Sequence, residues 1–153
     1  MISNLEIYKS IIICLEQKQL FITDALDITK QIEVQSKQED FEIDSLLNQR
    51  QTKIERMKKC DLLINQKLKE LQKHDKPQAD HWKAIVSGKK CELSDEYEKL
   101  AFDTATSIKS IAKKTIKIEK NARENLQQQY EEAKEKLSEI RKNNPPTSGM
   151  FNV

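Results

Sequence analysis

The sequence predicts an all-α protein, an elongated antiparallel helical bundle or coiled-coil hairpin of three long helices plus a short connector helix. Only two glycines and three prolines occur in 153 residues, too few for the many turns of a β-sandwich or an α/β sheet. Hydrophobic residues make up 37% of the chain and charged residues 34%, which suits long helices that each bury a narrow stripe. In addition, apolar residues recur in steps of three and four over residues 43–71.

This last pattern is a heptad ladder with two charged rungs. Seven of its nine positions are apolar, the spacing that holds one face of a helix against a neighbour. A charge in a packed seam loses hydration unless it finds a partner, so Arg50 and Asp61 are expected to fix the register of particular contacts. The rungs are Ile43, Leu47, Arg50, Ile54, Met57, Asp61, Ile64, Leu68 and Leu71.

A first helix is expected to begin at Ser3, whose hydroxyl can cap it while Glu6 completes a capping box. The pattern fades over residues 35–39, where no glycine or proline marks a break, so two separate helices and one bent helix both satisfy it. The predicted seam consists of Leu5, Tyr8, Ile12, Leu15, Ile22, Leu26 and Ile32, with the polar Gln19 in the middle.

The second helix is predicted over about residues 41–74, with Asp40 as its cap and an end before Pro77. Residues 77–88 then form a connector with a short helix around Trp82 and a stop at Gly88.

A last long helix is expected from about Cys91, with stutters at 100–108 and 122–130 that let it bend or change partners. Residues 1–142 are therefore expected to form a single helical domain, and residues 143–153 a flexible C-terminal tail. The stripe of the last helix consists of Leu93, Tyr97, Leu100, Ile108, Ile111, Ile118, Ala122, Leu126, Tyr130, Ala133, Leu137 and Ile140.

Charge is unevenly distributed along the chain. Residues 1–48 carry four basic and nine acidic side chains, whereas residues 49–90 carry twelve basic and five acidic ones. An acidic first helix beside a basic second helix favours antiparallel packing of the two. Exposed ion pairs contribute well under ~1 kcal/mol each, so they orient the helices more than they stabilise them.

The cysteines and the hydropathy indicate a soluble cytoplasmic protein without membrane insertion. Cys14, Cys60 and Cys91 are isolated, odd in number and form no CxxC motif, which is typical of reduced thiols. The apolar run over 11–15 has five residues, whereas a membrane span needs roughly 17.

The sequence gives little support for an enzyme, a cofactor or a metal site. It has no glycine-rich phosphate loop and no nucleophile elbow. His74 and His81 flank Pro77 near Asp75 and Asp80, but their spacing matches no zinc pattern, so a polar turn is favoured.

Two surfaces on the last helix are candidates for binding. The first is a basic stripe over 109–123, which could follow a phosphate backbone. No aromatic residues are interleaved to stack on bases, so a solvated face or a dock for an acidic protein partner is favoured over nucleic acid. The stripe contains Lys109, Lys113, Lys114, Lys117, Lys120 and Arg123.

The second surface is the set of candidate partner-binding residues Leu126, Tyr130, Ala133, Leu137 and Ile140. Such stripes most often pack in a core. This stripe lies near the end of the last long helix. Because the chain has only two other long helices, part of the last helix is expected to remain uncovered. Helix-in-groove recognition uses the same spacing, and Tyr130 could act as an amphipathic anchor.

One stretch of the sequence reads Asp40-Phe41-Glu42-Ile43-Asp44-Ser45-Leu46-Leu47-Asn48-Gln49-Arg50-Gln51, followed by Ile54, Met57 and Cys60-Asp61. This stretch resembles the FlgN-type flagellar export chaperones, and the related FliT-type chaperones share its arginine-plus-isoleucine helix. Cys60 stands where the family usually has leucine. A weaker match is Ile118-Glu119-Lys120-Asn121 with Leu126, and the middle of the chain is unmatched.

This resemblance implies a cytosolic chaperone of flagellar type III secretion, monomeric or weakly dimeric. Its clients would be the hook–filament junction proteins (the hook-associated proteins), whose amphipathic terminal helices it would cover until export. Export-apparatus components are further expected partners, with the basic stripe as their dock. The main alternative is a structural coiled-coil or adaptor protein that dimerises through the heptad seams.

Overall fold

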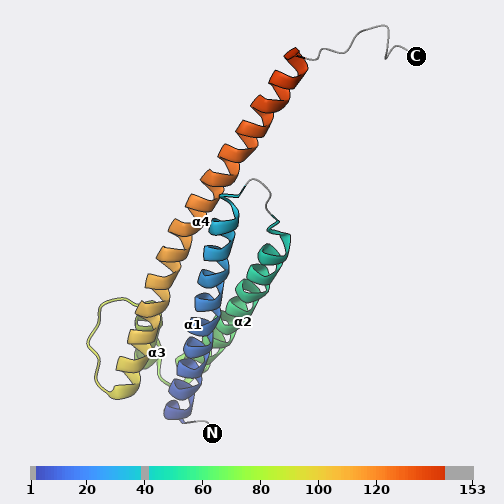
Figure 1. Cartoon of the computed structure of the whole chain (residues 1–153). Coiled ribbons are helices and arrows are strands. Elements are labelled where there is room, and N and C mark those ends of the chain that lie inside the picture. Colours follow the sequence, from blue (N-terminus) through green and yellow to red (C-terminus); the bar gives the residue numbers. More distant parts are fainter. Residues whose placement is uncertain (1–2, 39–41, 144–153) are drawn as a thin grey trace.

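The computed structural model describes residues 3–38 and 42–143, and over these residues the protein is all-α (Figure 1). The helices are α1 (Asn4–Gln35), α2 (Asp44–His74), α3 (Lys76–Val86) and α4 (Glu96–Asn143). The predicted three long helices and short connector are confirmed. Asp40, Phe41 and residues 144–153, where a cap, a helix start and a tail were predicted, lie outside the described residues.

The long helices run up, down and up along the bundle, so that each is antiparallel to the next. α1 and α2 are therefore separate helices rather than one bent helix. α1 and α4 run in the same direction, as their cross-links show. Gln19 donates to Ser107 at 2.8 Å, and further along both helices Asn125 donates to Ser36 at 3.2 Å.

α1 lies between α2 and α4 and packs along both (Figure 1). Eleven of its 32 residues are buried, and they spread over about half of the helix circumference, so the expectation of a narrow stripe is wrong for this helix. Leu5, predicted in the seam, is 43% exposed, whereas Ile7 and Ile11 are fully buried. The other buried residues of α1 are Ile12, Cys14, Leu15, Ile22, Ala25, Leu26, Ile28, Thr29 and Ile32.

The two charged rungs of the ladder connect α2 to two different helices. Asp61 pairs with Lys18 of α1 at 2.7 Å, and Arg50 pairs with Glu119 of α4 at 3.5 Å. Both charges therefore have a partner on a neighbouring helix, and the side chain of Asp61 is 48% exposed. That these pairs fix the register of the helices stays a prediction. Toward the end of α2, the apolar rungs Ile64, Leu68 and Leu71 are buried in the main core.

This main core is centred on α3, at the end of the bundle that holds the N-terminus. Trp82 is fully buried, and its ring stacks on Tyr8 with centroids 4.5 Å apart. Ile85 and Ala79 of α3 are also fully buried. The short helix thus closes this end of the bundle. A second, smaller cluster near the other end consists of Ile28, Ile32 and Ala122, with Ile43 and Leu46 packed against it.

Polar residues set most helix ends. The hydroxyl of Ser3 accepts a bond from the amide of Glu6, as predicted for a capping residue. Asp75 caps α3 in the same way, with Pro77 in the first turn. Gly88, at φ +68°, follows the end of α3 in the left-handed conformation that glycine adopts most readily.

The start of α4 differs from the prediction. The helix begins at Glu96 rather than near residue 91, because Asp95 caps it by accepting the amide of Glu98 at 2.8 Å. Tyr97 and Leu100, predicted in the stripe, are 37% and 46% exposed, and the carboxylate of Glu98 is buried instead. That carboxylate accepts hydrogen bonds from Ser94 and His81, which link α3 to the start of α4.

None of the helices in the described ranges combines the length and the apolar character that a membrane span needs.

Candidate functional site

α4 extends well beyond the end of α1. Among the described residues, the last hydrogen bonds between the two helices join Ser36, immediately after α1, to Asn125 and Gln129. Every residue of α4 from 130 to 143 is exposed, and this part, here called the overhang, projects alone from the bundle (Figure 1). Fourteen residues at 1.5 Å each give it a length of roughly 21 Å.

The sequence explains why the overhang is helical without tertiary contacts. It continues a helix that is already packed, so the unfavourable nucleation step is complete. Its composition favours helix, since its fourteen residues include four Glu, three Lys, one Arg, one Leu and one Ala. Side chains one turn apart also support each other as α4 leaves the bundle: Gln127 donates to Glu131 at 3.2 Å and Gln128 to Glu132 at 3.3 Å.

The five candidate partner-binding residues form one apolar stripe, which leads from the bundle onto the overhang. Leu126 is half-buried at the end of the bundle, and Ala133 is exposed. Tyr130, Leu137 and Ile140 are 65%, 49% and 58% exposed.

The apolar stripe lies on the bundle-facing side of α4. Ala122, one turn before Leu126, is buried against Ile28 and Ile32 of α1. Because steps of three and four residues keep to one side of a helix, the stripe continues the face that packs on α1. Past Leu126, the described part of the chain provides no helix that covers this face.

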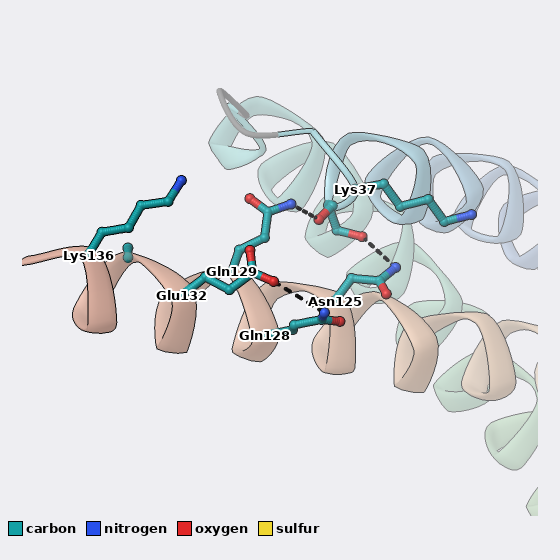
Figure 2. A pocket seen from close by; sticks show the side chains of 8 residues that line it. Lys37, Asn125, Gln128, Gln129, Glu132 and Lys136 are labelled. Carbon is teal, nitrogen blue, oxygen red and sulfur yellow. Dashed lines mark hydrogen bonds between the residues drawn. The ribbon is translucent and has the colours of Figure 1, made fainter. Parts of the chain in front are cut away.

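A polar hollow of about 450 Å³ marks the junction between the end of α1 and the overhang (Figure 2). Asn125 and Gln129 reach across it, donating to the hydroxyl and the carbonyl oxygen of Ser36, and Ser36 is fully buried. These bonds fix where α1 ends relative to α4. The hollow is lined by Ser36, Lys37, Asn125, Gln128, Gln129, Glu132, Ala133 and Lys136.

Sequence reasoning missed this junction. Asn125 and Gln129 read as ordinary solvent-facing residues, and Ser36 falls in the segment where the helical pattern fades. The available signal was the spacing of the two amides, which are four residues apart and so lie on one side of the helix.

The basic stripe lies on exposed parts of α4, before the overhang. Lys113, Lys114 and Lys117 are exposed, and Arg123 pairs with Glu119 at 2.7 Å. Ile116 among them is 66% exposed. No aromatic side chain lies within this segment of the helix.

His74 ends α2, His81 lies in α3, and Cys14, Cys60 and Cys91 are free thiols. Within the described residues, no three His, Cys, Asp or Glu side chains gather as metal ligands would. His74 is exposed, while His81 contacts Glu98. Cys14 and Cys60 are buried free thiols, and burial raises the pKa of both, which keeps them protonated and unreactive.

Comparisons of the chain with protein-family models, with curated proteins and with solved structures found no significant match. The function of the candidate surface therefore rests on its own geometry and on the residues that form it.

Proposed function

We propose that this protein is an export chaperone that holds an amphipathic helix of a client protein along the apolar stripe of α4. One observation carries the proposal: the side of α4 that packs on the bundle continues for fourteen residues past the end of α1, still apolar and uncovered. A client helix laid along this face would take the place that α1 occupies lower in the bundle.

The physical gain is the burial of large side chains that are now partly in water. Tyr130, Leu137 and Ile140 are each about half exposed or more. Covering a Leu or Ile completely is worth about 1.5–3 kcal/mol, so roughly half of this is available at each of these two positions. Contacts of this size favour a reversible complex, which suits a chaperone that must release its client.

The resemblance of residues 40–61 to FlgN-type chaperones suggests the class of client. In that family the clients are flagellar hook–filament junction proteins, whose terminal helices associate prematurely if uncovered. The projecting α4 would cover such a helix and present the client to the secretion machinery.

Hydrogen–deuterium exchange on the full chain tests this proposal. Alone, the protein should exchange quickly over 130–143 and slowly over 64–71. Addition of a junction protein's terminal helix should slow exchange over 126–143. Leu137→Asp should abolish that slowing without loss of helical circular dichroism. Ile116→Asp, on the same helix but off the stripe, is the matched control and should bind like the wild type.

A dimer formed through the same stripe is the second candidate, because its residues have the heptad spacing of a coiled coil. Sedimentation velocity separates the two. A chaperone should remain mainly monomeric without its client. A dimer that persists on dilution, with slow exchange over 130–143, would instead favour the structural coiled-coil role.

A further inference from the structure

The side chains that flank the apolar stripe are basic or neutral. In a heptad, Tyr130 and Leu137 take position a, and Leu126, Ala133 and Ile140 take position d. Positions e and g on either side of this seam face the flanks of a partner helix. In the overhang they are occupied by Lys134, Lys136, Arg141 and the neutral Asn143, and just before it by Gln127 and Gln129.

The glutamates of the overhang lie on its back. At 3.6 residues per turn, Lys134, Lys136 and Arg141 stand about 60–80° from the centre of the stripe. By the same geometry Glu131, Glu132, Glu135 and Glu139 stand about 120–180° from it. The overhang is nearly neutral overall, but its binding side is positive and its outer side negative.

These flanking cations differ from the charges inside the bundle. Arg50 and Lys18 each have a carboxylate partner on a neighbouring helix. Within the described residues, Lys134, Lys136 and Arg141 form no ion pair, and all three are exposed. A partner helix with acidic flanks would supply the missing carboxylates.

A second copy of this chain would not supply them. In a parallel pair, Lys136 of one copy faces Arg141 of the other. In an antiparallel pair centred near residue 135, Lys134 faces Lys134 and Lys136 faces Lys136. Like charges at these positions disfavour pairing, so the flanks oppose self-association while the seam itself is apolar.

We infer that the occupant of the apolar stripe is an acidic amphipathic helix of another protein, with Glu or Asp at the positions beside its apolar seam. This inference rests on the proposed function, because it specifies the charge of the helix that the chaperone captures. The cations select among apolar helices, and they keep the chaperone from pairing with itself.

The test uses two synthetic helical peptides of about 21 residues with the same leucine seam. One has Glu at positions e and g, and the other has Lys. Their dissociation constants for the full chain are measured by fluorescence anisotropy. With three favourable pairs replaced by three repulsive ones, we expect the acidic peptide to bind at least about tenfold more tightly at low salt. This preference should shrink in 0.5 M NaCl, where the charges are screened.

Reversing charges on the protein tests which residues cause the preference for the acidic peptide. The triple variant Lys134→Glu, Lys136→Glu, Arg141→Glu should reverse the preference, so that the basic peptide binds more tightly. The matched control reverses three exposed lysines of the same helix away from the stripe, as Lys113→Glu, Lys114→Glu and Lys117→Glu. It should keep the wild-type preference, and both variants should retain the helical signal of the wild type.

Failure of this inference is distinct from failure of the proposed function. If both peptides bind equally and the triple variant changes nothing, helix capture stands and the acidic partner is wrong. If neither peptide binds, helix capture itself is wrong. If the wild type forms a dimer at micromolar concentration that excludes both peptides, the occupant is a second copy, and the inference is overturned.

Discussion

Truncating one leucine at each end of the bundle would test whether the stripe is free or packed. Leu71, in α2, is fully buried in the main core, whereas Leu137, on the overhang, is 49% exposed. The same substitution, Leu→Ala, removes the same atoms at both positions. Any difference in the free energy of unfolding therefore reports how well each side chain is packed.

The expected magnitudes are far apart. Leu71→Ala should lower the free energy of unfolding by about 2–5 kcal/mol, because it leaves a cavity among well-packed neighbours. Leu137→Ala should change it by less than about 0.5 kcal/mol, as expected for a surface position. For a chain of this size, 1 kcal/mol corresponds to roughly 2–4 °C in Tm. Leu71→Ala should therefore lower Tm by roughly 4–20 °C and Leu137→Ala by at most about 2 °C.

The assay is urea and thermal unfolding followed by circular dichroism at 222 nm, at two protein concentrations tenfold apart. A loss of more than about 2 kcal/mol for Leu137→Ala would refute the reasoning, because an exposed leucine cannot contribute that much. If the loss grew with protein concentration, the stripe would be covered by a second copy. If it did not, the stripe would be covered from within the chain.

Three further predictions concern the bundle. Arg50→Ala should lower the free energy of unfolding by about 0.5–1 kcal/mol, because its pair with Glu119 is long and partly screened; an unchanged urea midpoint would contradict this. Trp82→Ala should lower it by about 3–5 kcal/mol, and Trp82→Phe by clearly less. Phe keeps a ring beside Tyr8, and it removes an indole N–H that has no hydrogen-bond partner among the described residues. Equal losses in urea would refute the stacking role. Burial alone would raise the pKa of Glu98, but hydrogen bonds from Ser94 and His81 and the charge of His81 outweigh it and lower this pKa. The unfolded state therefore binds more protons, so Glu98 adds stability above about pH 4.5 that is lost as the pH falls through its lowered pKa. Glu98→Gln should reduce the fall of the urea midpoint with decreasing pH. An unchanged fall would show that another carboxylate causes it.

The heptad ladder predicted the fold because its signal is local. Ile64, Leu68 and Leu71 keep to one helical face and are buried as the spacing predicts, whereas Leu47 of the same ladder is 36% exposed. The buried residues of α1 were harder to predict, because a helix that lies between two neighbours buries two faces. A single seam through Leu5 therefore missed Ile7, which lies on the broader buried side.

The start of α4 could not be predicted from hydropathy. Tyr97 and Leu100 have the right spacing for a stripe, yet Glu98 is buried between them. A buried carboxylate needs partners, and these come from Ser94 and from His81 across the α3–α4 connection. That connection is a tertiary feature with no periodic signal.

The candidate surface was partly predictable. Periodicity identified the apolar stripe, and the number of long helices suggested that part of the last one would be uncovered. Sequence alone could not place the end of α1 against Asn125 and Gln129, because a break in helical pattern does not give its distance from another helix. That placement decides that Leu126 is half-buried and Tyr130 exposed.

The two hydrophobic clusters have a thermodynamic consequence for the bundle. The cluster around α3 contains fourteen buried residues, whereas the one beside the overhang contains three. Cooperative units with fewer buried contacts unfold locally at lower free energy. The overhang end of the bundle should therefore unfold before the α3 end does. A helix bound on the apolar stripe would extend the smaller cluster and raise the free energy of this opening. A helix on the stripe would thus be detected as slower hydrogen exchange at the end of α1, about 20 Å from the far end of the overhang.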